Sequence, residues 1–232
     1  MQNVYAIPVH ETNETERATF IRQTYLHLAM AVLGFILVEL ILFQTGIAEG
    51  IAMLLLGGRW TWLIALGVFM FISHKADSWA RNSDSEQMQY MALALYTIGE
   101  AIIFVPLLYM AMAITESTSI IAQAGLMTLF LFIGLTIVVF TTKKDFSFLR
   151  NILAIGFSLA FGAILIGIIF GFQFGLFLSL IMVALAAGSI LYQTSNLIYN
   201  YNTKQHVAAA LGLFASLMLL FWYILSIFMR SE

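Results

Sequence analysis

The stretch Leu191-Tyr192-Gln193-Thr194-Ser195-Asn196-Leu197-Ile198 places four consecutive polar side chains in an otherwise apolar run of sequence. A hydroxyl or amide that is buried in apolar surroundings without a hydrogen-bond partner is unfavourable. We therefore expect these side chains to face water, a neighbouring helix or an ion path. Which of these surroundings they face decides what the stretch can do.

The composition predicts an all-α membrane protein. Among the 232 residues 62% are hydrophobic and 9% are charged, and the charged residues cluster between long uncharged runs. A soluble domain carries roughly 25% charged residues. The uncharged runs have the length of a transmembrane helix, about 20 residues, and lack the roughly 10-residue alternating pattern of an outer-membrane barrel. Helices satisfy every backbone polar group internally, as the bilayer core requires.

Seven apolar segments predict a seven-transmembrane-helix bundle that forms a single membrane domain over residues 1–232. The segments cover 24–46, 51–74, 89–113, 119–141, 151–172, 174–198 and 206–229. The second is the weakest, because Gly57-Gly58-Arg59 splits it into a short interfacial piece and a run that is short for a span. Residues 1–22 precede the first span, and the pattern from Arg17 to Tyr25 predicts an amphipathic, interfacial start of its helix.

The basic residues predict the orientation of the bundle. With the N-terminus in the cytoplasm, Arg59 and Arg230 lie outside and the other eight basic residues lie inside. The positive-inside rule therefore predicts a cytoplasmic N-terminus and an external C-terminus. The formal net charge is -2 and no basic run can follow a phosphate backbone, so nucleic acid is not an expected partner. The eight residues are Arg17, Arg22, Lys75, Arg81, Lys143, Lys144, Arg150 and Lys204.

Two carboxyl groups fall inside the predicted spans. Glu39 lies in the outer part of the first span, where it either reaches the outer surface or stays neutral, and structural tolerance explains it at least as well as function. Glu100 lies near the middle of the third span, where a charge is most unfavourable. Pro106 leaves the carbonyl of Ile102 without its helical hydrogen bond, close to Glu100. Glu100 is therefore either a cation or proton site or part of an interhelix hydrogen bond.

The sequence predicts no enzyme and no resident cofactor. It contains no cysteine, its histidines lack metal-binding spacing, and no Gly-x-Ser-x-Gly motif occurs. The loop between the fourth and fifth spans has a different expected role. Lys143 and Lys144 can contact anionic headgroups, and Asp145 or Ser147 is expected to cap the helix that follows.

Five stretches follow one another along the chain in an order that is typical of a known family. They are Arg17…Phe20…Tyr25, Tyr96 to Pro106, Lys143-Lys-Asp-Phe-Ser-Phe-Leu149, Leu191-Tyr-Gln-Thr-Ser195 and Ala210-Leu-Gly-Leu-Phe-Ala-Ser-Leu-Met-Leu-Leu-Phe221. In this order the chain resembles the bacterial branch of the Bax inhibitor-1 (transmembrane Bax inhibitor motif) family. The resemblance implies a bacterial inner-membrane protein whose seventh helix is surrounded by the other six. It also implies a pH-sensitive calcium leak, gated by two aspartates in spans six and seven near the cytoplasmic mouth.

This sequence departs from the family at both aspartates, which are replaced by Gln193 and Ser216. An amide and a hydroxyl cannot share a proton as a carboxyl pair does, so pH gating is expected to be altered or lost. We expect Gln193 and Ser216 to be hydrogen-bonded to each other at the cytoplasmic mouth. Their oxygens, with Asn196 nearby, remain weak candidate ligands for a transient calcium ion, and the sequence leaves a metal site undefined.

The resemblance therefore favours an ion leak or transport path, for calcium first, with Glu100 supplying any remaining dependence on protonation. The alternative is a non-conducting regulator that binds a membrane protease or another membrane protein, as some bacterial relatives are associated with. That alternative predicts that the N-terminal segment and the loop from Lys143 to Arg150 matter more than the core. The expected partners are thus the lipid bilayer, calcium and a membrane protein.

Overall fold

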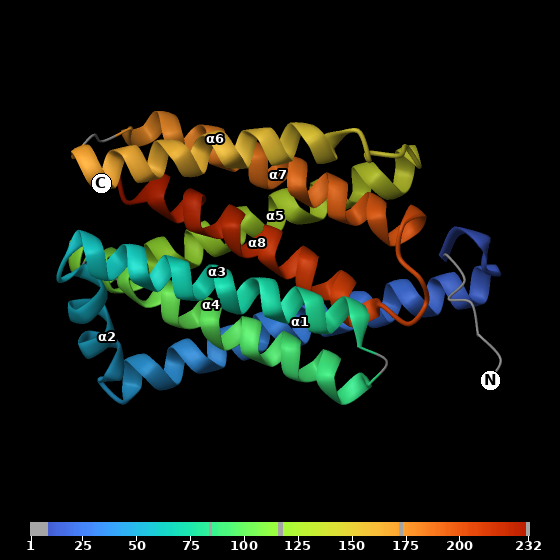
Figure 1. The fold of residues 1–232 in the computed structure, drawn as a ribbon, viewed down its shortest axis with the longest axis horizontal. Helices are drawn as coiled ribbons and strands as arrows, with labels where there is room; N and C mark the ends of the chain where they lie inside the picture. The colour runs from blue at the N-terminus through green and yellow to red at the C-terminus, as the bar shows by residue number, and fades with distance from the viewer. Residues whose placement is uncertain (1–8, 84, 116–117, 172–173, 231–232) are drawn as a thin grey trace.

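The structure, a computed structural model, describes residues 9–83, 85–115, 118–171 and 174–230, and the regular elements in these ranges are helices. They follow the order η1 (Val9–Glu11), α1 (Glu14–Gln44), α2 (Ile47–Leu56), α3 (Arg59–Asn82), α4 (Glu86–Thr115), α5 (Ser119–Thr142), α6 (Leu149–Phe170), α7 (Gly175–Tyr199) and α8 (His206–Phe228). The long helices lie roughly along one axis, with the start of α1 and the end of α8 at opposite ends of the bundle (Figure 1). The all-helical prediction is confirmed. Residues 1–8 of the predicted N-terminal segment and residue 172 of the predicted fifth span lie outside the described ranges.

The last helix, α8, lies at the centre of the bundle. Every residue from 206 to 214 is buried, and buried residues continue to Leu225. A helix that is apolar on all sides needs neighbours on all sides. α8 packs against α1, α3, α4, α5 and α7, whereas α6 packs mainly on α7. The helix of the predicted seventh span, α8, is therefore central as expected, but α6, the helix of the predicted fifth span, stands outside the ring around it.

The predicted second span, residues 51–74, is not one helix. The chain breaks at Gly57 and Gly58 into α2 and α3, which are bent by 111° relative to each other. A Cβ atom at Gly57 would lie 2.8 Å from the carbonyl oxygen of Met53, so a side chain there requires the backbone to shift. By length and composition, α1 and α4 to α8 are six candidate spans of the described chain, and the bent pair adds a seventh if it crosses as one unit.

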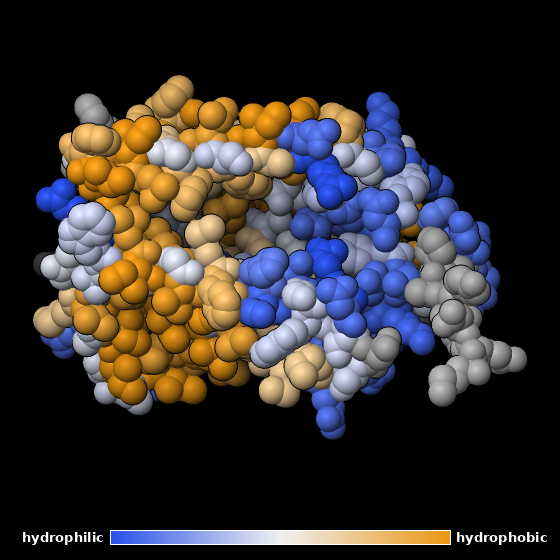
Figure 2. Space-filling model, viewed as in Figure 1, coloured by the Kyte–Doolittle hydropathy of each residue, from blue (hydrophilic) through white to orange (hydrophobic). Residues whose placement is uncertain are grey.

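The basic side chains are divided between the two ends of the bundle. The end where α1 begins, called the basic end below, holds the eight basic residues predicted to lie on one side. Arg59 and Arg230 lie at the opposite end, beside the end of α6 and the start of α7. Figure 2 shows hydrophilic surface around the basic end and mostly apolar surface toward the other. The positive-inside rule predicts that the basic end faces the cytoplasm.

Candidate functional site

The four consecutive polar residues of α7 face four different surroundings, because successive helix residues are rotated by roughly 100°. Gln193 faces α8, and Thr194 faces the hydroxyl of Tyr25 on α1. Ser195 contacts the loop between α5 and α6, and Asn196 lines a polar cavity. The polar run is therefore the place where α7 meets several other parts of the molecule at once.

A row of uncharged polar residues, called the polar stripe below, follows one face of α7. It consists of Ser189, Gln193, Asn196 and Asn200, whose spacing of four, three and four residues places them on one side of the helix. The Asn200 side chain donates from Nδ2 to Oδ1 of Asn196 at 2.6 Å. The stripe leads from within the α7–α8 contact to the basic end.

The deep end of the polar stripe is a pair of serines. The Oγ atoms of Ser189 and Ser216 are 2.8 Å apart, and the Ser216 hydroxyl also donates to the carbonyl oxygen of Gly212 at 3.0 Å. Among the described residues, Ser216 forms no hydrogen bond with Gln193, so the predicted contact between these two side chains is wrong. Ser189 lies one helical turn deeper than Gln193 and takes the position opposite Ser216.

Gln193 is instead pressed against Gly212 of α8. Three atoms of its carboxamide lie 3.0 to 3.1 Å from the position that a Cβ atom at Gly212 would take, so glycine is what leaves room for them. The Gln193 Oε1 atom is buried and accepts no hydrogen bond from the described residues. A buried acceptor without a donor is unfavourable by about 1–3 kcal/mol. Packing therefore holds this oxygen in a position that hydrogen bonding does not favour.

Ser195 and Tyr199 of α7 hold the loop between α5 and α6. The backbone amide of Phe146 donates to Ser195 Oγ at 2.9 Å, and Ser195 donates to Oδ1 of Asp145 at 3.3 Å. The Tyr199 hydroxyl donates to the carbonyl oxygen of Lys143 at 2.7 Å. The polar run of α7 thus fixes a loop that lies far from it in the sequence.

Asp145 does not cap α6, and the predicted cap is wrong. The N-cap of α6 is Phe148, which makes no side-chain capping bond. Asp145 Oδ1 accepts instead from the hydroxyl and the backbone amide of Ser147, at 2.5 and 2.8 Å. The hydrogen bonds from Ser147 lower the pKa of Asp145, so the carboxylate is ionised at neutral pH. Lys143 and Lys144 are exposed beside it.

A polar cavity of about 590 Å³ lies at the basic end. Its walls come from the end of α3, the α5–α6 loop, the start of α6, the end of α7 and the α7–α8 loop. Ligand sites have similar volumes, about 300–1,000 Å³, but are mostly apolar. This cavity is lined almost entirely by polar and charged side chains, namely Arg81, Ser147, Arg150, Asn151, Tyr192, Asn196, Asn200, Tyr201 and Gln205.

Two arginines make the rim of the polar cavity positive. Arg81 lies 2.7 Å from Oδ1 of Asp77 and stacks over the ring of Tyr201 at 5.3 Å, so its charge is partly balanced. Arg150 is exposed and forms no ion pair within the described ranges. The cavity therefore presents neutral amide and hydroxyl groups inside a cationic rim.

Glu100 lies between two aromatic layers in the middle of the bundle. Tyr96 and Phe104 lie four residues to either side of it, on the same face of α4. Tyr96 contacts the ring of Phe214, and Phe104 contacts the ring of Phe35. Glu100 is 6% exposed, and its Oε2 atom has no hydrogen-bond partner in the described part of the chain. Because α4 packs on α8 and not extensively on α7, the structure does not bring Glu100 to the polar stripe.

Glu39 lies in a third place, near the end of α1 that is far from the basic end. Its side chain is 7% exposed and lines an apolar cavity between α1, α4, α5 and α8, so it does not reach the outer surface. The predicted site residues therefore fall into separate groups. Gln193 and Asn196 share the polar stripe with Ser189, which pairs with Ser216, while the two glutamates lie elsewhere.

Sequence reasoning missed the partners that give the site its geometry. The four-residue spacing of Ser189 and Gln193 would have shown that either can face α8. No pattern marks Gly212, because its role depends on which α7 side chain packs onto it. The same is true of Arg81, which reaches the cavity from the end of α3 only through the fold.

The chain matches known proteins along most of its length. The family model described as inhibitor of apoptosis-promoting Bax1 matches residues 17–232. The uncharacterized protein PA2604 of Pseudomonas aeruginosa is 32% identical over 163 residues, which cover 69% of this chain and 68% of that protein. An uncharacterized membrane protein of Vibrio cholerae is 27% identical over 220 residues, which cover 94% of this chain and 92% of that protein. Protein LIFEGUARD 4 of Arabidopsis thaliana is 29% identical over 160 residues, which cover 62% of this chain and 59% of that protein. The apolar helical bundle and the match of the family model over residues 17–232 show that this chain is a multi-pass membrane protein of the Bax inhibitor-1 family.

Proposed function

We propose that this protein is a leak path for small cations across the bacterial inner membrane, closed by Gln193, with calcium as the first ion to test. The observation that carries the proposal is the Gln193 carboxamide oxygen, buried without a donor where the polar stripe meets Gly212. An unsatisfied polar atom inside a membrane bundle points to a functional site. On one side of it lies Asn196 with the polar cavity, and on the other lies the serine pair.

The chemistry of the stripe supports passage of a cation rather than its storage. Calcium binds oxygen ligands, including carbonyl and amide oxygens, and binds more weakly when carboxylates are few. The stripe offers such neutral oxygens and no carboxylate. The positive rim formed by Arg81 and Arg150 opposes cation entry, so we expect a slow leak and not a fast channel. We put calcium first because the chain resembles a family that is associated with a calcium leak.

The proposed gate moves and does not titrate. Neither a carboxamide nor a hydroxyl changes charge between pH 5 and 8. Opening therefore requires the Gln193 side chain to leave Gly212, which changes only side-chain torsions. We assign any pH dependence of the leak to Glu100, the buried carboxyl in the middle of the bundle.

Replacing Gln193 with alanine is expected to raise the leak by about tenfold, equivalent to a barrier lower by ~1.4 kcal/mol. In the native protein the Gln193 carboxamide fills the space beside Gly212 and blocks the polar stripe. Its removal opens that space. Calcium and potassium fluxes into proteoliposomes measure the effect. The matched control is Gln123→Ala, which removes an exposed glutamine side chain from α5. If neither the native protein nor Gln193→Ala carries either ion above empty liposomes, the leak proposal fails.

Replacing Glu100 with glutamine tests the assignment of pH dependence. Glutamine has nearly the same shape but cannot take up or release a proton, so the flux of Glu100→Gln is expected to be the same at pH 6 and pH 8. The native protein should differ severalfold between these values. Glu49→Gln, which changes an exposed carboxyl on α2, is the control. An unchanged pH profile in Glu100→Gln would remove this residue from the mechanism.

A non-conducting regulator is the second candidate, favoured by the fixed loop between α5 and α6. Hydrogen bonds with Ser195 and Tyr199 hold this loop in one conformation, with Lys144 and the ring of Phe148 exposed. A preordered exposed loop suits contact with another membrane protein, such as a protease. A membrane protein that copurifies with the native chain and is lost with Ser195→Ala, without any measurable ion flux, would favour this function.

A further inference from the structure

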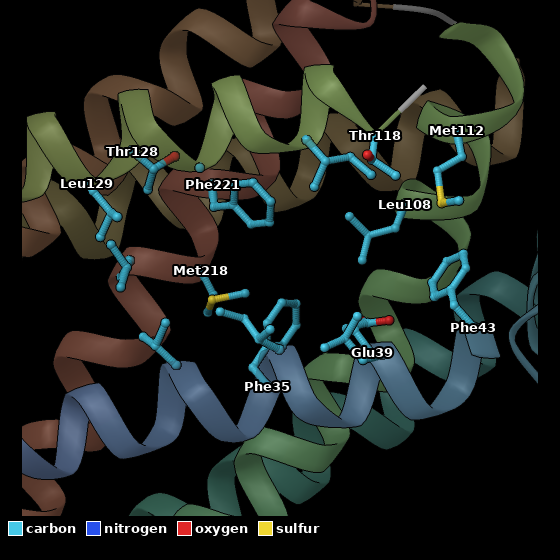
Figure 3. Close-up of a pocket in the computed structure, with 16 residues that line it drawn as sticks. Phe35, Glu39, Phe43, Leu108, Met112, Thr118, Thr128, Leu129, Met218 and Phe221 are labelled. Carbon is cyan, nitrogen blue, oxygen red and sulfur yellow. The ribbon is translucent and has the colours of Figure 1, made fainter. Parts of the chain in front are cut away.

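A second cavity, distinct from the polar one, lies in the half of the bundle far from the basic end. It has a volume of about 410 Å³ and is bounded by α1, α4, α5 and α8. Figure 3 shows side chains of α1 and α5 facing each other across it, with Met218 and Phe221 of α8 between them. Apart from Glu39 and two threonines, its lining is apolar or glycine. Its size and lining are those of a small-molecule site.

Glu39 is the one ionisable side chain among the residues that line this cavity. It is 7% exposed, and neither carboxyl oxygen has a hydrogen-bond partner among the described residues. In Figure 3 it extends from α1 among Phe35, Phe43 and Leu108. The hydroxyl of Thr128 cannot serve it, because it donates to the carbonyl oxygen of Ala124 at 2.7 Å. A carboxyl held this way is unfavourable whether charged or neutral, since the neutral form also leaves its hydroxyl unpaired.

The cavity is open toward the hydrocarbon side of the bundle and not toward the polar cavity. Ile36 and Leu40 on α1 and Leu129 on α5 line it and are also exposed on the surface of the bundle. The two helices that form its sides, α1 and α5, do not pack extensively against each other in the described ranges. A molecule dissolved in the bilayer can therefore enter sideways, between these helices.

We propose that this cavity binds a single-chain alkylamine from the bilayer, with its protonated amino group on Glu39 and its hydrocarbon chain along α8. An amine supplies the positive charge and the N–H donors that the carboxyl lacks, and a charge-assisted hydrogen bond is stronger than a neutral one. The alkyl chain matches the walls formed by Phe35, Met218 and Phe221. An alcohol offers no charge and a fatty acid places two carboxyl groups together, so both fit less well.

This site does not depend on the proposed leak. It uses α1, α5 and the outer part of α8, whereas the leak path uses the α7 face of α8 and the basic end. Binding of an alkylamine would be observed whether or not the protein conducts ions. Failure of the two proposals can therefore be told apart.

Binding of radiolabelled dodecylamine to the full-length protein in phosphatidylcholine nanodiscs tests the proposal. Choline headgroups have no N–H donor, so the surrounding lipid does not mimic the probe. We expect saturable binding that unlabelled dodecanol displaces at least tenfold less well than unlabelled dodecylamine. Glu39→Gln should weaken dodecylamine binding about tenfold, because the amide keeps the shape but loses the charge. The control Glu49→Gln should bind like the native protein. Equal binding by Glu39→Gln and the native protein would overturn the proposal.

A second variant tests the location without changing any charge. A Cβ atom at Gly125, on the α5 wall of the cavity, would meet nothing within 4 Å. Gly125→Leu should therefore fill the cavity without disturbing the fold and abolish dodecylamine binding. Gly134→Leu, on the same helix and equally free of contacts, does not border the cavity and should leave binding unchanged. Full binding by Gly125→Leu, or equal loss in both leucine variants, would contradict the site.

Discussion

Replacing Phe214 with alanine is expected to lower the free energy of unfolding by roughly 3 kcal/mol, at the low end of the range for buried phenylalanines. Phe214 lies in the middle of α8, is 0% exposed and packs edge to face against Tyr96 at 6.0 Å. Truncation leaves a cavity beside α8, the helix against which α1, α3, α4, α5 and α7 all pack. The value is at the low end because lipid, and not water, surrounds the separated helices of a membrane protein.

The Phe214→Ala effect can be measured by unfolding the protein with increasing sodium dodecyl sulfate in mixed micelles. Phe130→Ala is the matched control, because Phe130 on α5 is 73% exposed on the outside of the bundle. Its loss should change the stability by less than about 0.5 kcal/mol. Equal destabilisation by the two variants would show that α8 is not the packed centre of the molecule.

Replacing Ser216 with aspartate is expected to lower the stability by roughly 3–5 kcal/mol at pH 8, because it buries a charge without a partner of opposite sign. Ser216 is buried, and within the described part of the chain its hydroxyl forms hydrogen bonds with the hydroxyl of Ser189 and the backbone carbonyl oxygen of Gly212. The carbonyl oxygen would repel a carboxylate, and the Ser189 hydroxyl could donate one hydrogen bond to it but supplies no positive charge. The same substitution restores the carboxyl that the family resemblance implies at this position. The variant therefore tests both the stability of the bundle and the proposed gate.

The charge of the Ser216→Asp variant can be separated from its size by comparison with Ser216→Asn, which is nearly isosteric. We expect Ser216→Asn to be destabilised by only about 1 kcal/mol. The two variants should converge when the pH is low enough to neutralise the introduced carboxylate. Ser85→Asp, in an exposed loop at the basic end, controls for the added charge. Thermal unfolding in detergent at pH 5 and pH 8 measures all three, and equal stability of the aspartate and asparagine variants at pH 8 would contradict the burial argument.

The errors of the sequence-based predictions have one common cause. Gln193 was expected to contact Ser216, but Ser189 does so. Residues three or four apart lie on the same face of a helix, and the sequence of one helix does not determine its axial shift against another. Asp145 or Ser147 was expected to cap α6, but Phe148 is the N-cap, and Asp145 Oδ1 accepts hydrogen bonds from Ser147 and Ser195. In each case the approximate place of the residue was right, and its hydrogen-bond partners were wrong.

The sequence did not show how two residues of the candidate sites are packed. Gly212 is one of 16 glycines in the chain, and only the contact with Gln193 distinguishes it from glycines that serve other purposes. Structural tolerance explained Glu39 at least as well as function, because its burial beside an apolar cavity depends on the gap between α1 and α5. Long-range packing decides both features, and no local pattern records it.

The sequence by itself determined that this is an all-helical membrane protein, since uncharged runs of helix length can satisfy their backbone only within helices. It also determined how the basic residues divide between the two ends, and the polar run at Gln193 to Asn196 as the unusual part of α7. The tertiary structure decided which surroundings those four side chains face: α8 for Gln193, α1 for Thr194, the α5–α6 loop for Ser195 and the polar cavity for Asn196. The physical reason is that burial and helical period depend on nearby residues, whereas the rotation and axial shift of one helix against another depend on the packing of the whole bundle.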